Sequence, residues 1–197
     1  MKRVIALTLA LLLLSFCGCA GNYAVNPLFG VCLMVNGSLY ICQSVVADSE
    51  LPAGLEYIGS IEEFGSSLPT QNFVSTSNDF GNELYQLPDE TDKVYSYNSE
   101  KEQHWLYARC DTGVVLNGWL YISDSESTES SLPGGYSSIE TISACVESGV
   151  PTAEFEAMGI ESGTEIFSTS SNEQYIYAQL SDTSYLRLSR FIKISVN

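Results

Sequence analysis

Basic residues are scarce in this chain, where 8 lysines and arginines stand against 24 acidic residues and give a formal net charge of −16 at pH 7. Two of the eight, Lys2 and Arg3, open an N-terminal apolar segment; if that segment is removed, 6 bases face 24 acids and the charge becomes −18. Nucleic-acid binding needs lysine and arginine opposite the phosphates, so the composition excludes nucleic acid as a partner. Anionic lipid headgroups would also repel this protein.

Histidine is nearly absent, since the chain contains only His104. One histidine cannot supply a His-rich zinc site, and no C-x-x-C pair follows the N-terminal segment. No G-x-S-x-G nucleophile elbow accompanies His104, and glycine-rich phosphate loops are missing. We therefore expect no enzyme, no cofactor and no metal site, and we interpret His104 as an ordinary strand residue.

Long hydrophobic runs are confined to the N-terminus. Val4 to Leu14, interrupted only by Thr8, form an apolar run after Lys2 and Arg3. This run is too short to cross about 30 Å of hydrocarbon as a permanent helix, and a positive start followed by a short apolar core is typical of a signal peptide. The sequence therefore predicts an exported protein.

A small residue directly before a cysteine follows this apolar core, in Phe16-Cys17-Gly18-Cys19-Ala20. This stretch resembles the lipobox of bacterial lipoproteins. The resemblance implies a signal peptide over residues 1–19, a lipid on Cys19, and a location on the outer face of the cytoplasmic membrane, held by the lipid alone. Residues 20–28 would then form a tether. Ordinary secretion, with cleavage after Ala20, is the alternative.

An Asn-Gly pair between apolar runs occurs twice. Val35-Asn36-Gly37-Ser38-Leu39-Tyr40-Ile41 returns in the second half of the chain as Leu116-Asn117-Gly118-Trp119-Leu120-Tyr121-Ile122. Asn and Gly tolerate the positive φ angles of a type I′ turn, so this pattern is a strong hairpin signal. The sequence therefore predicts a tandem repeat of one β module.

Further matches extend the repeat over nearly the whole unit. Pro52-Ala53-Gly54 matches Pro133-Gly134-Gly135 at the same offset of 81 as the Asn-Gly pairs, and Pro69-Thr70 matches Pro151-Thr152 at 82, so one residue is inserted between them. Runs rich in Tyr, Val and Trp without helical spacing favour strands. We predict an all-β protein with modules over residues 29–109 and 110–197, each of five to six antiparallel strands. The stretch 136–145 also fits a short helix, but its sister stretch alternates as a strand does.

The pattern V-N-G-x-L-Y, followed by P-x-G, G-x-I, P-x-x-N and S-N-x-x-G-x-x-L-Y, resembles small tandem-repeat lipoproteins of Gram-positive, Clostridia-like bacteria. Repeat one carries it at Val35 to Tyr40, Pro52 to Gly54, Gly59 to Ile61, Pro69 to Asn72 and Ser77 to Tyr85. Repeat two keeps the hairpin and the prolines, but it loses the S-N step and has Glu154 in place of Asn72. The resemblance covers most of the mature chain and implies no defined activity.

Four cysteines follow the signal segment: Cys32, Cys42, Cys110 and Cys145. An even number of cysteines in an oxidising compartment is typical of disulfides. Each repeat holds one pair that its sister lacks, so we predict Cys32–Cys42 and Cys110–Cys145 bridges. The first pair is out of register by one residue across a two-residue turn, and four reduced, buried thiols are the alternative.

Binding is expected where the two repeats differ, in the stretches 72–78 and 154–159 and in the acidic stretch after Ile122. The candidate binding residues are Asn72, Asn78, Asp79, Asp124, Glu126 and Glu129. We interpret 124–129 as a solvated, self-repelling loop; it lacks EF-hand spacing, and a looser Ca²⁺ site is the alternative. Several of the 12 tyrosines fall at strand positions, where packing is favoured over a binding face.

These observations together predict a non-catalytic extracytoplasmic binding protein. A surface this negative speeds the association of a cationic partner, so we expect a cationic peptide as the ligand near the membrane, in a role similar to that of immunity lipoproteins. The alternative is a structural or accessory subunit of a membrane-protein complex.

Overall fold

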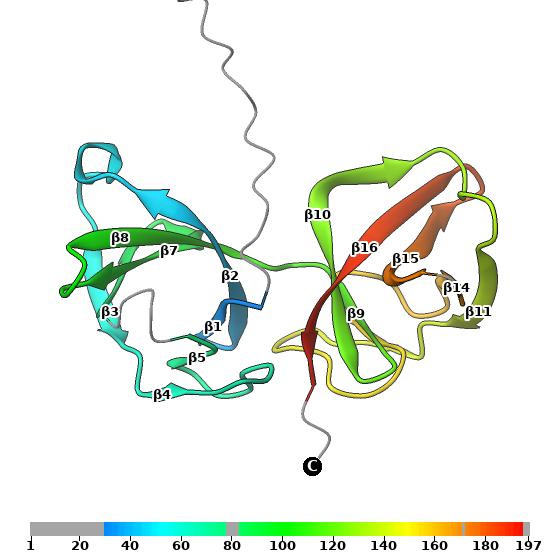
Figure 1. Ribbon diagram of the computed structural model, residues 1–197, viewed down its shortest axis with the longest axis horizontal. Helices are drawn as coiled ribbons and strands as arrows, with labels where there is room; N and C mark the ends of the chain where they lie inside the picture. The colour runs from blue at the N-terminus through cyan, green and yellow to red at the C-terminus, as the bar shows by residue number, and fades with distance from the viewer. Residues whose placement is uncertain (1–29, 78–82, 171, 195–197) are drawn as a thin grey trace, which may run out of the picture.

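The computed structural model describes residues 30–77, 83–170 and 172–194, without the side chains of 124–127, 172 and 173. Over this part of the chain the protein folds into two eight-stranded sheets, one in each repeat, with the same strand order in both (Figure 1). The predicted all-β architecture of two tandem modules is confirmed. In the described residues, no helix is long and apolar enough to cross a membrane.

The first sheet has the order β3-β6-β7-β8-β2-β1-β5-β4. Its strands are β1 (Cys32–Val35), β2 (Ser38–Val46), β3 (Glu56–Ser60), β4 (Glu63–Phe64), β5 (Val74–Ser75), β6 (Glu83–Leu87), β7 (Glu90–Asn98) and β8 (Gln103–Arg109), with a 3₁₀ turn η1 (Asp48–Glu50) after β2. All pairs are antiparallel except β4 with β5, which is parallel. The prediction of five or six strands omitted the two-residue strands β4 and β5.

The second sheet repeats this arrangement in the order β11-β14-β15-β16-β10-β9-β13-β12. Its strands are β9 (Gly113–Leu116), β10 (Trp119–Glu129), β11 (Ser137–Thr141), β12 (Ala144–Cys145), β13 (Glu156–Met158), β14 (Glu165–Thr169), β15 (Asn172–Ser181) and β16 (Ser184–Lys193). The stretch 136–145, which also fitted a short helix, contains β11 and β12. The acidic stretch after Ile122 is not a loop, because β10 continues to Glu129 with a bulge between Ser123 and Thr128.

Both Asn-Gly pairs form the predicted tight turns. Asn36 and Gly37 have φ angles of 50° and 76°, and Asn117 and Gly118 have 53° and 72°. These are the two successive positive φ angles that a type I′ turn needs. Val35 consequently pairs with Ser38, which fixes the register of the hairpin strands.

The hairpins are buried on both faces. On β1, Leu33 and Val35 face the core of repeat one, whereas Cys32 and Met34 belong to a second cluster that draws residues from both repeats. This second cluster, called the shared core below, comprises Cys32, Met34, Leu39, Ile41 and Leu68 from repeat one and Val115, Leu120, Ile122, Met158, Phe191, Ile192 and Ile194 from repeat two. Burial on both faces explains why β1 is a continuous apolar run and does not alternate.

The shared core joins the two modules. Figure 1 shows the β1–β2 hairpin on the side of the first module that faces β9 and β16 of the second. A backbone hydrogen bond from Leu68 N to Lys193 O, 3.2 Å long, also crosses between the modules. The two repeats therefore pack together through the element that defines the repeat.

Candidate functional site

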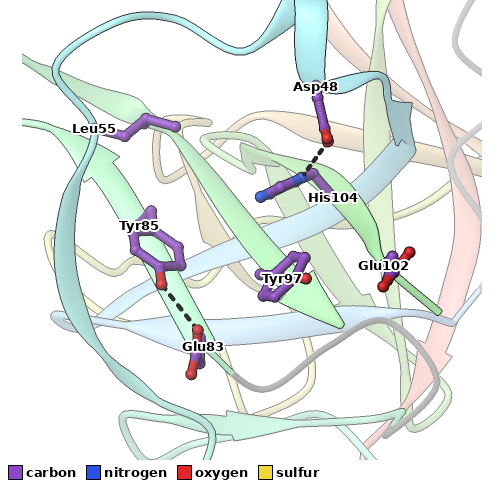
Figure 2. A pocket seen from close by; sticks show the side chains of 7 residues that line it. All are labelled: Asp48, Leu55, Glu83, Tyr85, Tyr97, Glu102 and His104. Carbon is purple, nitrogen blue, oxygen red and sulfur yellow. Dashed lines mark hydrogen bonds and ion pairs between the residues drawn. The ribbon is translucent and has the colours of Figure 1, made fainter. Parts of the chain in front are cut away.

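A cavity of about 490 Å³ opens on repeat one (Figure 2). Its walls are formed by Asp48, Leu55, Glu83, Tyr85, Tyr97, Glu102 and His104. Side chains alternate between the two faces of a strand, and Leu84, Val94 and Tyr107 fill the core of repeat one. The cavity residues of β6, β7 and β8 occupy the alternate positions, so the cavity lies on the face of the sheet that points away from this core.

Strand register places three of the lining side chains in a row. Glu83 on β6 is opposite Tyr97 on β7, and Tyr97 is opposite His104 on β8. The rings of Tyr97 and His104 lie 4.7 Å apart between centroids, at an interplanar angle of 30°. These two rings form a tilted stack, called the Tyr97–His104 wall, with the Glu83 carboxylate next to it in the row.

Hydrogen bonds hold four of the polar side chains in two pairs. His104 Nδ1 lies 3.1 Å from Asp48 Oδ1, which projects from the 3₁₀ turn after β2, and the Tyr85 hydroxyl donates to Glu83 Oε2 over 2.8 Å. This bond to the Glu83 carboxylate is the main reason that the pKa of Tyr85 is raised. Both contacts are drawn in Figure 2.

Negatively charged side chains dominate the lining of the cavity. Asp48, Glu83 and Glu102 contribute three carboxylates, and none of the seven lining residues is a lysine or arginine. Aromatic ring faces carry a negative quadrupole and attract cations. Carboxylates beside ring faces form a site that favours a positively charged group.

Asn72, a predicted binding residue, has a structural role. Its Oδ1 accepts a hydrogen bond from the turn amide of Gly37 over 2.8 Å. In repeat two the carboxylate of Glu154 accepts from Asn117 N and Gly118 N, over 2.8 and 2.7 Å. The two residues differ chemically but hold the same hairpin turn.

The other predicted binding residues are placed differently. Asn78 and Asp79 lie outside the described residues, as do Cys19 and the side chains of Asp124 and Glu126. Glu129 is described: it accepts a hydrogen bond from the Tyr177 hydroxyl over 3.1 Å and lies 3.7 Å from Arg187 Nη1. Glu129 is therefore held within repeat two.

Both predicted disulfides are wrong, because all four cysteines are free thiols. Cys32 pairs with Ile41 across the two-residue turn, so Cys42 points to the opposite face of the hairpin. Cys32 faces the shared core and Cys42 the core of repeat one. Cys110 packs against the shared core, whereas Cys145 on β12 is exposed. Burial raises the pKa of the Cys32 and Cys42 thiols to about 12.

The tyrosines divide between packing and lining. Tyr95, Tyr107 and Tyr177 are buried, as the packing interpretation predicted, whereas Tyr85 and Tyr97 line the cavity. His104 is a strand residue as predicted, but its place in the cavity was missed because its partner Asp48 is far away in the sequence. The available signal was the alternation that puts Glu83, Tyr85, Tyr97 and His104 on the same face of neighbouring strands.

Among the residues that the structure describes, no group of three or more His, Cys, Asp and Glu side chains could hold a metal ion. The chain matches no protein-family model, no curated protein and no solved structure.

Proposed function

We propose that this protein is a non-catalytic, extracytoplasmic binding protein that captures cationic peptides at the membrane surface through the cavity of repeat one. The observation that carries the proposal is the lining of that cavity, which combines three carboxylates with the Tyr97–His104 wall and contains no lysine or arginine. The lipid on Cys19, inferred from the lipobox resemblance, would hold this cavity close to the membrane that a cationic peptide attacks.

Physical magnitudes favour a ligand with several charges. A cation over an exposed aromatic ring gains about 0.5–1 kcal/mol, and an exposed ion pair gains about 0.2–1 kcal/mol. One ring contact and one or two ion pairs give about 0.7–3 kcal/mol for one side chain, a factor of about 3 to 150 in affinity. One amino acid would bind weakly, whereas a peptide whose other charges meet the acidic surface would bind well and associate faster.

The test is titration calorimetry of the full mature protein with a Lys- and Arg-rich antimicrobial peptide at about 20 mM and about 300 mM salt, where the screening lengths differ several-fold. The affinity is expected to fall at least about tenfold at the higher salt, because the screening length is then shorter. Absence of heat at low salt would end the proposal. If a membrane protein then cross-linked to the chain on intact cells, the accessory-subunit hypothesis would replace it.

A matched pair of substitutions places the binding in repeat one. Glu83 begins β6 and Glu165 begins β14, at equivalent positions of the two sheets. Glu83→Gln keeps the size and an acceptor for Tyr85 but removes the charge, and it should weaken binding about five- to tenfold, the scale of about 1 kcal/mol. Glu165→Gln should change it less than about twofold. Equal effects would show that the whole acidic surface, and not the cavity, binds the peptide.

A further inference from the structure

Repeat two carries a cation of its own on the face that bears the cavity in repeat one. Arg187 on β16 lies two positions after Tyr185, the counterpart of His104, and therefore on the same face of the strand. Its guanidinium carbon is 5.3 Å from the centroid of the Tyr175 ring, and its Nη1 is 3.7 Å from Glu129 Oε1. A guanidinium is thus held between a tyrosine ring and a carboxylate.

Further aromatic groups surround this arginine. The Tyr177 hydroxyl donates to the same Glu129 carboxylate, and Tyr136 packs edge-to-face on Tyr177 at 4.8 Å between centroids. The side chains of Arg187 and Glu129 are 35 % and 34 % exposed, so the pair is only partly accessible. The positive charge of Arg187 also lowers the pKa of Tyr136 and Tyr177, although burial and Glu129 raise both overall.

Repeat one has the acid of this arrangement but neither its arginine nor the ring on which the arginine lies, because Lys93, opposite Ala108, takes the position of Tyr175, opposite Ser189. At the repeat offset of 81, Leu106 takes the position of Arg187. Each repeat has an acid at the end of the second hairpin strand: Glu129 is opposite Tyr185 in the register of β10 and β16, and Asp48 follows β2 and contacts His104. The acid that contacts a guanidinium in repeat two thus has its counterpart, Asp48, in the cavity of repeat one, beside the rings of Tyr97 and His104.

We infer that the cavity of repeat one binds the guanidinium group of an arginine side chain in the peptide ligand, the group that Arg187 provides within repeat two. The inference rests on the proposed function and names its ligand chemistry. A guanidinium is planar and weakly hydrated, stacks on aromatic rings and donates to carboxylates in a fixed fork, whereas the lysine ammonium is a compact, strongly hydrated point charge. The ring faces of Tyr97 and His104 beside the carboxylates of Glu83 and Glu102 therefore fit a guanidinium better than an ammonium group.

The test compares three short peptides of identical sequence whose two cationic positions hold arginine, lysine or citrulline, the uncharged analogue of arginine. Calorimetry on the full mature protein should give one site for the arginine peptide, about fivefold or more tighter than for the lysine peptide, and no binding of the citrulline peptide. Lysine binding as tight as arginine overturns the guanidinium assignment and leaves the proposed function standing. Failure of both charged peptides ends both proposals.

A second arm installs the arginine of repeat two in repeat one. Leu106→Arg should place a guanidinium beside Asp48, as Arg187 lies beside Glu129, and weaken binding of the arginine peptide at least about tenfold, whereas Leu106→Gln, with a similar length and no charge, should weaken it less than about threefold. Thermal unfolding verifies that both variants fold. Unchanged affinity in a folded Leu106→Arg protein would overturn the assignment of the guanidinium site to the cavity beside Asp48.

Discussion

The shared core predicts that the two modules unfold as one unit. Leu39 and Leu120 occupy equivalent positions in the two hairpins, and they are 1 % and 0 % exposed within this core. Replacing a buried leucine by alanine removes its transfer free energy and leaves a cavity, at a cost of about 2–5 kcal/mol. Each substitution should therefore destabilise the protein by that amount, although each lies in a different module.

The assay uses the two tryptophans, since Trp105 is in repeat one and Trp119 in repeat two. With Trp119→Phe or Trp105→Phe as background, urea unfolding followed by fluorescence reports one module at a time. Leu39→Ala should lower the midpoint reported by Trp119 as much as the midpoint reported by Trp105. In a double-mutant cycle, Leu39→Ala and Leu120→Ala should couple by about 0.5–3 kcal/mol, because both belong to one packed cluster.

Leu84→Ala is the matched control, because Leu84 is 0 % exposed but belongs to the core of repeat one alone. Leu84→Ala should lower the free energy of unfolding by a similar amount. In the double mutant with Leu120→Ala, the two losses should add to within about 0.5 kcal/mol. If Leu39→Ala moved only the Trp105 transition and left the Trp119 transition in place, the shared core would be refuted. Two modules that unfold independently, with water between them in place of packed apolar side chains, would give that result.

Three further predictions concern the turns and the thiols. Glu154→Ala removes two hydrogen bonds to turn amides, and Asn72→Ala removes one. At about 0.5–1.5 kcal/mol for each bond, and more where the acceptor is charged, the loss of stability should be at least about twice as large for Glu154→Ala; equal losses in urea midpoint would contradict this. The exposed thiol of Cys145 should react first with Ellman's reagent in the native mature protein, and any disulfide-linked peptide in a non-reducing digest would argue against the free thiols. Burial raises the pKa of Cys32 from 9.0 to about 12, so the native state keeps a proton that the unfolded chain releases above pH 9. The contribution of this thiol to the free energy of unfolding is therefore complete below pH 9 and falls between pH 9 and 12, by up to about 1.4 kcal/mol per pH unit. Over this pH range the urea midpoint should decline less steeply in Cys32→Ala than in the wild-type protein. Parallel declines in the two proteins would contradict the burial of this thiol.

Local turn chemistry made much of the fold predictable. Type I′ turns need two positive φ angles that few residues other than Asn and Gly adopt. The Asn-Gly pairs therefore predicted the positions of the turns and of the hairpin strands beside them. The inserted residue was also placed correctly: Gly65 N bonds to Ser75 O and Val146 N to Ala157 O, so the offset grows from 81 to 82 within this pair of segments.

Non-local pairing was less predictable. The strands β4 and β5 have two residues each and pair in parallel across an intervening connection, which leaves no periodicity to detect. The disulfides failed because counting cysteines ignores which face of the strand each one occupies. In the hairpin the two-residue turn puts Cys32 and Cys42 on opposite faces. Strand register therefore decides whether two cysteines can meet, even where their number is even.

The cavity was missed because its lining comes from separate segments that only the completed sheet brings together. Asp48 follows β2, Glu83 begins β6, and the Tyr97–His104 wall spans β7 and β8. The sequence instead indicated the positions where the repeats differ, and there Asn72 and Glu154 turned out to serve the same turn. Equal structural roles can thus be met by unlike residues.

The most direct test of the cationic-ligand site uses the one histidine of the chain, which lies in the cavity. Its ring protons give a single set of histidine signals in the proton NMR spectrum of the mature protein, recorded at a fixed pH while the arginine peptide is added. A guanidinium against the Tyr97–His104 wall should shift these signals, and the shift should saturate with the affinity found by calorimetry. Heat of binding with unmoved His104 signals would contradict the proposed site, because the peptide would then bind elsewhere on the acidic surface.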